Sequence, residues 1–299
     1  MIEEIKRLKE EKDVVILAHY YVDGAVQELA DFVGDSYFLA KKATEVTQKN
    51  ILFCGVSFMG ESAKILNPGK KVVMADEHAD CPMAHMVDID RIHEVREQYP
   101  DVAVVCYVNS TAELKANSDV CVTSSNALKV VKALPNKVIY FIPDQHLGTY
   151  ISKQVPEKKF IFNDGGCPVH TMLTKADILS ALEAHPGAKV LVHPECKEEV
   201  TDLADYVGST SGIIEYATNS DAAEFIIVTE LGVMYELKRR NPEKSFYAAG
   251  QHQICDDMKK VTLDKIISVL EQDDEGLIMS ADFMDKANAP LKRMLELSR

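Results

Sequence analysis

Short apolar runs alternate with amphipathic stretches along the whole chain. Continuous runs rich in β-branched residues, which are typical of strands in a buried parallel sheet, occupy 14–19, 102–107 and 188–193. Between such runs, apolar residues spaced three and four positions apart predict amphipathic helices, for example over 88–101, 175–187 and 262–275. This alternation predicts an α/β sandwich with helices on both faces of each sheet.

The pattern repeats three times with one period. The first strands end at His19, Tyr107 and His193, with steps of 88 and 86 residues, and the second strands keep the same steps at Ser36, Ser124 and Thr210. A third set of apolar runs begins at 51, 138 and 225, and cysteines recur at 81, 167 and 255. Four markers in register indicate internal repetition.

Each repeat reads helix, strand, helix, short strand, helix, strand, helix, strand. We therefore expect three homologous three-layer α/β/α sandwich domains with short parallel sheets, docked around a pseudo-threefold axis. Their expected bounds are 1–86, 87–172 and 173–260. The tail, 261–299, begins a fourth copy with a helix and a strand at 275–280, and we expect it to pack on the first repeat.

Polar side chains follow the predicted strands. In parallel sheets ligands bind beyond the carboxyl ends of the strands, so these positions are candidates for a site. After the first strands come His19 with Tyr21, Tyr107 with Asn109, and His193 with Glu195; after the second strands come Ser36, Ser124, Ser209 and Thr210. If the repeats face one another, these residues converge on one central cavity. The serines also have an ordinary alternative role as helix caps.

The three periodic cysteines, Cys81, Cys167 and Cys255, are candidate metal ligands. Three thiolates without a fourth suit a zinc site with an open position or an iron–sulfur cubane with one iron free of protein ligands. A proline follows the first two, as it does in some cluster-binding runs, which favours iron. Nearby histidines that could complete a zinc site instead are His78, His85, His170 and His252. The remaining cysteines are Cys54, Cys106 and Cys121, which lie in apolar runs, and Cys196, which has no counterpart in the other repeats.

Composition and charge narrow the class of protein. The formal net charge of −14 argues against nucleic acid and anionic membranes as partners, and no apolar run reaches the roughly 18 residues of a membrane span. The charged N-terminal stretch is not an apolar signal, so we expect a cytoplasmic protein whose cysteines are reduced. A small anionic substrate remains compatible with this charge, because backbone N–H groups and a bound cation supply local positive potential.

Nine ordered motifs together resemble the quinolinate synthase family over essentially the whole chain. They are ILAHYY, FVGDS, CPM, YVNS, TSSNA, CPVH, VHPEC, YVGST and a late cysteine followed by MKKVTL. The resemblance implies three homologous α/β domains around one 4Fe-4S cluster held by three cysteines, with one open iron. It also implies a dehydrating transferase reaction of the EC 2.5.1 class, in which iminoaspartate condenses with dihydroxyacetone phosphate to give quinolinate for NAD biosynthesis. A separate iminoaspartate-forming enzyme would supply the first substrate.

The resemblance assigns roles to matching positions. The cluster ligands are Cys81, Cys167 and Cys255, and the substrate contacts are His19, Ser36, Tyr107, Val108, Asn109, Ser124, His193, Pro194, Glu195 and, in the GSTSG segment, Ser209 and Thr210. The candidate acid–base residues are His19, Tyr21, Tyr107, His193 and Glu195. Some family members carry a CxxCxxC pattern at the third ligand, but this chain has only Cys255 there. Two other functions stay open: a cluster-dependent hydro-lyase acting on a dicarboxylate, and an iron–sulfur sensor.

Overall fold

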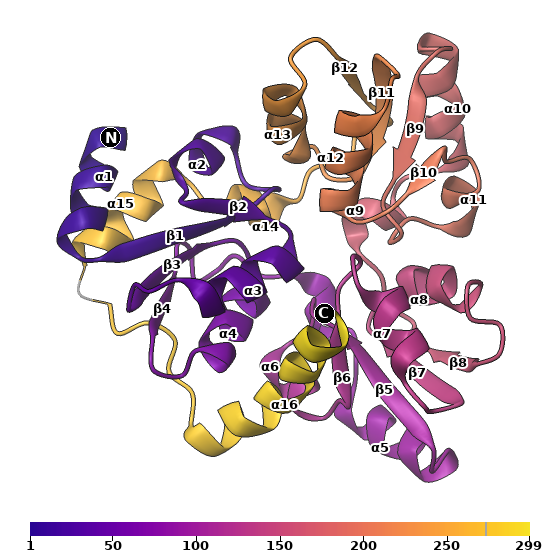
Figure 1. Cartoon of the computed structure of the whole chain (residues 1–299), viewed down its shortest axis with the longest axis horizontal. Coiled ribbons are helices and arrows are strands. Elements are labelled where there is room, and N and C mark those ends of the chain that lie inside the picture. Colours follow the sequence, from indigo (N-terminus) through magenta and orange to yellow (C-terminus); the bar gives the residue numbers. More distant parts are fainter. Residues whose placement is uncertain (273) are drawn as a thin grey trace.

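The computed structural model describes residues 1–272 and 274–299 and contains three four-stranded parallel sheets within them. The sheets have the strand orders β2-β1-β3-β4, β6-β5-β7-β8 and β10-β9-β11-β12, so the topology is the same in each. Figure 1 shows the three sheets, with their flanking helices, arranged around a common centre. The predicted fold class, three repeated α/β units, is confirmed.

The first unit follows the predicted order of elements. It comprises α1 (Ile2–Glu11), β1 (Val14–His19), α2 (Gly24–Leu29), β2 (Phe32–Gly34), α3 (Ser36–Glu45), β3 (Asn50–Cys54), α4 (Ser57–Leu66) and β4 (Lys71–Met74). A short 3-10 helix, η1 (Pro82–His85), leads to the second unit.

The second unit repeats this order. It comprises α5 (Ile89–Gln98), β5 (Val102–Tyr107), α6 (Ala112–Ala116), β6 (Val120–Val122), α7 (Ala127–Ala133), β7 (Val138–Ile142), α8 (Gln145–Ser152) and β8 (Lys159–Phe162). The third comprises α9 (Pro168–Thr171), α10 (Lys175–Ala184), β9 (Lys189–Val192), α11 (Glu198–Thr201), β10 (Tyr206–Val207), α12 (Thr210–Asn219), β11 (Glu224–Val228), α13 (Val233–Arg240) and β12 (Ser245–Ala248). The remaining helices are α14 (Asp256–Lys259), α15 (Leu263–Glu271) and α16 (Ala281–Leu297).

The apolar runs form the centres of the sheets. Every residue of β5 is buried, as is typical of a parallel strand covered by helices on both faces. Cys106 and Cys121 are register partners on β5 and β6, and both are fully buried in the core. Cys54 and Cys196 are buried as well, so these four cysteines pack as small apolar side chains.

One carboxylate in each unit binds the first strand of its sheet. Asp31, Asp119 and Asp205 accept hydrogen bonds of 2.8, 2.7 and 2.9 Å from the backbone N–H groups of Ile16, Val104 and Val190. Both sets of three residues keep the steps of 88 and 86. Because hydrogen bonds to ionised acceptors are the stronger kind, each carboxylate fixes the loop before the short second strand against the first strand.

A lysine in each unit binds the C-terminal end of the helix that follows the short second strand. Lys70, Lys158 and Lys244 again lie 88 and 86 residues apart. Their ammonium groups donate to backbone carbonyl oxygens at the C-terminal ends of α3, α7 and α12. A cation at this end of a helix satisfies free carbonyl groups and opposes the negative end of the helix dipole.

The C-terminal tail differs from its predicted form. No strand forms over 275–280; Leu277 N–H donates one hydrogen bond of 2.8 Å to Val72 O, and Gly276 has a φ of 74° that breaks an extended pattern. The helix α15 packs on α1 of the first unit, whereas α16 contacts α4 of the first unit and α6, β6 and α7 of the second. None of the helices in the described parts of the chain is long and apolar enough to cross a membrane.

Candidate active site

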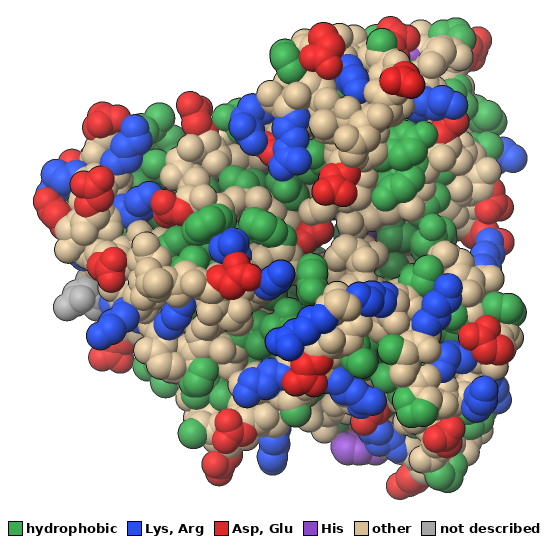
Figure 2. All heavy atoms as spheres, in the orientation of Figure 1, with side chains coloured by type: hydrophobic (Ala, Val, Ile, Leu, Met, Phe, Trp, Pro, Cys, Tyr) green, Lys and Arg blue, Asp and Glu red, His purple; other side chains and the backbone are tan. Residues whose placement is uncertain are grey.

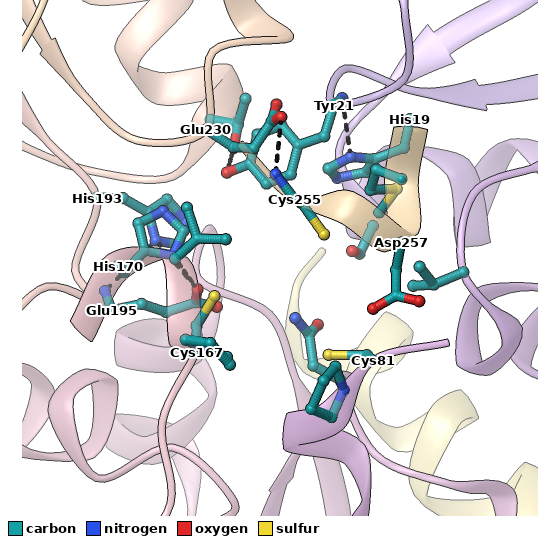
Figure 3. A pocket seen from close by; sticks show the side chains of 18 of the residues that line it. His19, Tyr21, Cys81, Cys167, His170, His193, Glu195, Glu230, Cys255 and Asp257 are labelled. Carbon is teal, nitrogen blue, oxygen red and sulfur yellow. Dashed lines mark hydrogen bonds and ion pairs between the residues drawn. The ribbon is translucent and has the colours of Figure 1, made fainter. Parts of the chain in front are cut away.

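A cavity of about 530 Å³ lies where the three units meet. Of the predicted site residues, those that line it are His19, Tyr21, Ser36, Cys81, Tyr107, Asn109, Ser124, Cys167, His193, Glu195, Thr210 and Cys255. Figure 3 shows side chains from separate units pointing into this space. Residues up to 236 positions apart (19 and 255) therefore share one site, because the carboxyl ends of all three sheets face the centre.

Three predicted contacts do not line the cavity. Val108 and Pro194 are buried beside residues that do, and their side chains take part in packing. Ser209 is the N-cap of α12, where its hydroxyl accepts a hydrogen bond of 3.2 Å from Gly212 N–H. In the structure Ser209 therefore has the role of a helix cap, the alternative given for the serines above.

His19 and His193 have equivalent settings in the first and third units. Each follows a strand, and each Nδ1 accepts a hydrogen bond from the backbone N–H two residues on, from Tyr21 at 3.2 Å and from Glu195 at 3.4 Å. This bond places the proton of the neutral ring on Nε2. Burial lowers the pKa of both histidines to about 3, so they are neutral hydrogen-bond donors near pH 7.

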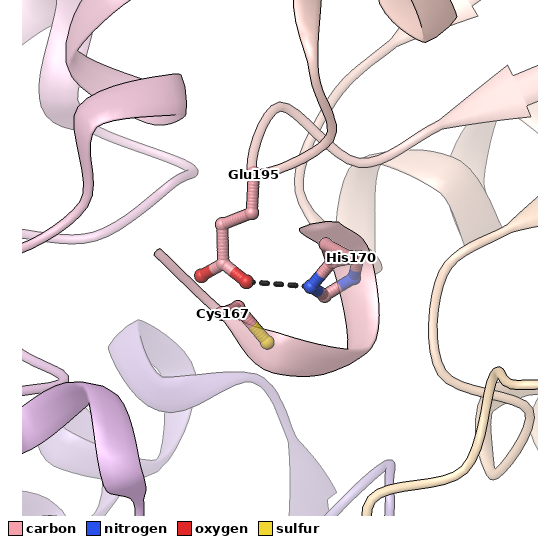
Figure 4. Close-up of side chains that lie close together, drawn as sticks. All are labelled: Cys167, His170 and Glu195. Carbon is pink, nitrogen blue, oxygen red and sulfur yellow. Dashed lines mark ion pairs between the residues drawn. The ribbon is translucent and has the colours of Figure 1, made fainter. Parts of the chain in front are cut away.

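Glu195 is a buried carboxylate that lines the cavity. Its Oε2 lies 2.7 Å from His170 Nδ1 and 3.8 Å from His193 Nδ1, and the two imidazole rings stack with centroids 4.6 Å apart. Burial alone would raise the pKa of Glu195, but the neighbouring imidazole groups of His170 and His193 and the Tyr107 hydroxyl lower this pKa to about 2. Glu195 is therefore ionised near pH 7, and Figure 4 shows it facing His170 beside Cys167.

A chain of hydrogen bonds connects His170 to the first unit. His170 Nε2 lies 2.9 Å from Thr229 Oγ1, which lies 2.8 Å from the Tyr21 hydroxyl. The Tyr21 hydroxyl in turn lies 2.8 Å from Thr210 Oγ1. Burial raises the pKa of Tyr21 well above its usual value, so its hydroxyl keeps its proton. A buried chain of this kind can carry a proton between its ends.

Sequence reasoning missed Thr229 and placed His170 only among possible zinc ligands. Thr229 comes directly after β11, at the same edge of the sheet as the predicted residues. This position after a strand is the feature of the sequence that could have identified Thr229 as a site residue. Of the other histidines near the cysteines, His252 lines the cavity, whereas His78 and His85 lie on the surface.

Tyr107 and Asn109, at the end of β5 in the second unit, also line the cavity. Burial raises the pKa of Tyr107 well above its usual value, and the charge of Glu195 adds to this shift. The side-chain oxygen of Asn109 is buried and has no hydrogen-bond partner among the residues that the structure describes. Because buried polar atoms are almost always paired, this oxygen is suited to accept a hydrogen bond from a ligand.

The three periodic cysteines have the same local structure. Cys81, Cys167 and Cys255 are the N-cap residues of η1, α9 and α14, and Figure 3 shows their sulfur atoms facing the same space. Burial raises the pKa of each thiol, to about 12 for Cys81, while backbone N–H groups of the following turn act in the opposite direction. Such thiols stay protonated until a metal binds them as thiolates.

The positions of the three cysteine sulfur atoms can be compared with the geometry of a single zinc ion. A tetrahedral zinc ion with bonds of about 2.3 Å holds its sulfur ligands about 3.8 Å apart. The three cysteines do not form a set with all ligand atoms within 4.8 Å; among the described residues only Cys167, His170 and Glu195 do. As they stand, the three sulfur atoms are therefore not placed around a single zinc ion.

The anion-binding capacity of the cavity comes from helix ends and hydroxyl groups. Among the described residues, no lysine or arginine lines it, although basic and acidic side chains are interspersed over the face shown in Figure 2. Thr210 is the first residue of the ten-residue helix α12.

The glycines at both ends of the GSTSG segment have a packing role. A Cβ at Gly208 or Gly212 would lie 2.4 or 2.5 Å from the Tyr206 hydroxyl oxygen.

Three α/β units that bring histidines, tyrosines, a carboxylate and three cysteines into one interdomain cavity define a small-molecule enzyme. The chain belongs to the quinolinate synthetase A family, whose model, described as "Quinolinate synthetase A protein", matches residues 3–296. A protein named quinolinate synthase from Fusobacterium nucleatum is 53% identical over 298 residues, which cover 100% of this chain and 99% of that protein. Proteins of the same name from Clostridioides difficile and Aquifex aeolicus are 50% and 47% identical, with 99% of this chain covered in each case and 97% and 93% of those proteins. The predicted family is confirmed.

Proposed function

We propose that this chain catalyses the reaction of a quinolinate synthase in NAD biosynthesis, in the cytoplasm. One iminoaspartate and one dihydroxyacetone phosphate give one quinolinate, one phosphate and two waters. The observation that carries the proposal is the convergence of three repeat-related cysteines with strand-end acid–base residues in one cavity of about 530 Å³. This volume suits two small substrates that must be held together.

The cofactor in this proposal is a 4Fe-4S cluster held by Cys81, Cys167 and Cys255. The N-cap position of each cysteine and the wide spacing of the sulfur atoms support it. When bound, such a cluster supplies a Lewis acid through its one iron that has no protein ligand. The compact set of Cys167, His170 and Glu195 would suit a single ion instead, and the metal analysis described below separates the two.

The residues of the chain would supply the proton transfers. Condensation and loss of two waters require groups that take up and release protons. Glu195, as the ionised carboxylate, is suited to accept a proton, and the chain from His170 through Thr229 to Tyr21 can return one at the Tyr21 hydroxyl. Tyr107 keeps its proton and can donate a hydrogen bond to a substrate oxygen.

Neutral groups and helix ends would bind the anionic substrates. With no lysine or arginine lining the cavity, a phosphate would be held by the hydroxyl groups of Ser36, Ser124 and Thr210 and by the N-terminal end of α12. The corresponding end of α3 is less suited to an anion, because the Asp35 carboxylate caps Phe38 N–H there and lines the cavity. His19 and His193, as Nε2–H donors, and Asn109 would orient the second substrate.

Anaerobic purification with iron and sulfide analysis, followed by a turnover assay, tests this function. We expect a brown protein with about four irons and four sulfides per chain, which forms quinolinate only when both substrates are present. Stoichiometric zinc with full activity would rule out the cluster. Turnover of a dicarboxylate without the triose phosphate would identify a hydro-lyase, and a loaded cluster with no turnover of either kind would favour a sensor.

A further inference from the structure

Each of the three cavity cysteines donates its backbone N–H to a carboxylate. The bonds run from Cys81 to Asp80 Oδ1 at 2.8 Å, from Cys167 to Asp144 Oδ2 at 3.2 Å, and from Cys255 to Glu230 Oε1 at 3.2 Å. The acceptors in these bonds come from three different units, and the periodic sequence markers include none of them. The same contact therefore occurs three times in one site.

Asp144 and Glu230 occupy equivalent positions in the second and third units, 86 residues apart. They follow β7 and β11 by two residues, and both side chains are fully buried. The other oxygen of each carboxylate accepts a second backbone N–H, from Leu147 at 2.7 Å and from Gly232 at 2.6 Å. Each carboxylate thus joins the end of a central strand to a cysteine loop. Burial of a charged acid is costly. Glu230 Oε1 also lies 3.0 Å from Lys259 Nζ, which pairs its charge, and burial raises the pKa of Asp144 well above its usual value. The two backbone hydrogen bonds are the contact that both side chains share.

The first unit reaches the same contact by a different route. Its position equivalent to Asp144 is Val56, 88 residues earlier, which cannot accept a hydrogen bond. The carboxylate is supplied instead by Asp80, which precedes Cys81 and accepts a hydrogen bond from the hydroxyl of Ser57, the residue after Val56. Two different sequence solutions at the same corner of the unit indicate that the bond to the cysteine N–H is the feature retained.

We propose that Asp80, Asp144 and Glu230 are positioning residues for the metal-binding cysteines. A cysteine whose N–H is fixed to a carboxylate has its backbone held at the start of the following helical turn, so its Sγ projects into the cavity before any metal binds. This arrangement lowers the cost of ordering three separate loops around one cofactor. The inference rests on the proposed function, since it takes the three cysteines as the ligands of the cluster.

Hydrogen exchange of the full chain, isolated anaerobically, tests the positions directly. In Glu230→Gln and Asp144→Asn an amide nitrogen replaces one acceptor oxygen, so one of two backbone N–H donors loses its partner. Glu230→Gln also removes the charge opposite Lys259 Nζ at 3.0 Å, so Asp144→Asn, whose side chain has no ion-pair partner among the described residues, is the decisive variant. Exchange should accelerate over 250–258 but not 163–170 in Glu230→Gln, and over 163–170 but not 250–258 in Asp144→Asn. Asp205→Asn is the matched control: it alters a carboxylate that binds the strand N–H of Val190 in the same unit as Glu230, without contact to a cysteine, and both segments should keep the exchange of the parent.

Cofactor retention gives a second measurement. Loss of a group that orients a metal ligand typically costs roughly 10–100-fold in metal affinity, so the chelator concentration that removes half of the iron at equilibrium should fall by about this factor in both variants, but not in Asp205→Asn. Unchanged exchange in both variants, or acceleration of both segments together, would overturn the inference. If the parent chain binds no iron while the local exchange effects persist, the proposed cluster function fails and the positioning of the cysteines stands.

Discussion

Replacement of Thr229 by valine should interrupt the hydrogen-bond chain between Glu195 and Tyr21 without changing the shape of the cavity. Thr229 is fully buried, and its hydroxyl is the one link between His170 Nε2 at 2.9 Å and the Tyr21 hydroxyl at 2.8 Å. Valine has nearly the same volume but cannot accept or donate a hydrogen bond. Thr229→Ser keeps the hydroxyl and loses a methyl group, so it is the matched control.

The structure sets the size of both effects. Tyr21 keeps its bond to Thr210, whereas His170 Nε2 loses its partner, and one unpaired buried polar group costs about 1–3 kcal/mol of unfolding free energy. A positioned acid–base group contributes about 10²–10⁴-fold to the rate, so kcat of Thr229→Val should fall by about this factor. KM for both substrates should change little, because Thr229 does not line the cavity.

Steady-state kinetics of the anaerobically loaded protein, with iron content measured on the same sample, is the assay. Thr229→Ser should retain most of the parent kcat, and iron content should be equal in all three proteins. A Thr229→Val enzyme with kcat within about threefold of the parent would refute the proton path, since the two ends of the chain would then act without their link. Loss of iron in Thr229→Val would show instead that the threonine supports the cysteine loops.

Three further predictions concern the cofactor, the phosphate site and pH. Cys255→Ser should abolish cluster assembly, seen as loss of visible absorbance, whereas Cys54→Ser, in the core of the first unit, should not. Thr210→Val removes one hydrogen bond to a charged group, about 1.5–3 kcal/mol, and should lower kcat/KM for dihydroxyacetone phosphate roughly 10- to 100-fold; an unchanged value would leave this hydroxyl only its bond to Tyr21. Burial lowers the pKa of His193 to about 3, so below pH 6.5 the unfolded chain binds a proton that the folded chain does not, and unfolding free energy should fall with pH by about 1.4 kcal/mol per unit down to pH 3. His193→Asn should reduce this slope, and equal slopes in urea titrations of both proteins would contradict the assigned pKa.

The sequence could predict those features that depend on local pattern and on period. The bounds 14–19 and 102–107 agree with β1 and β5, because strands buried on both faces appear as continuous apolar runs. The run at 275–280 has only three apolar residues in succession; among the described residues it makes one backbone hydrogen bond to β4, it contains a glycine with positive φ, and it forms no strand. An apolar run alone does not reveal whether a partner strand is in register with it.

The candidate site could be predicted only in part, for a related reason. Positions equivalent in the repeats, such as His19 and His193, follow from spacing, and the structure places both in the cavity. The link from His170 to Thr229 joins residues 59 apart, and that from Thr229 to Tyr21 joins residues 208 apart. These separations are not multiples of the repeat, so no periodic signal identifies them. Periodicity also includes Ser209 beside Thr210, although only Thr210 lines the cavity.

One repeated scaffold supplies groups of different acidity at equivalent positions. The equivalent positions are Tyr21, Asn109 and Glu195, which follow His19, Tyr107 and His193 by two residues in the three repeats. They lie 88 and 86 residues apart, and all three line the cavity. Burial keeps Tyr21 protonated, whereas the neighbouring histidines keep Glu195 ionised; Asn109 cannot titrate. Near pH 7 the site thus offers one base, one acid and one neutral acceptor at related positions. Divergence of one position in three copies therefore provides groups of different acidity for the condensation with two dehydrations that we propose.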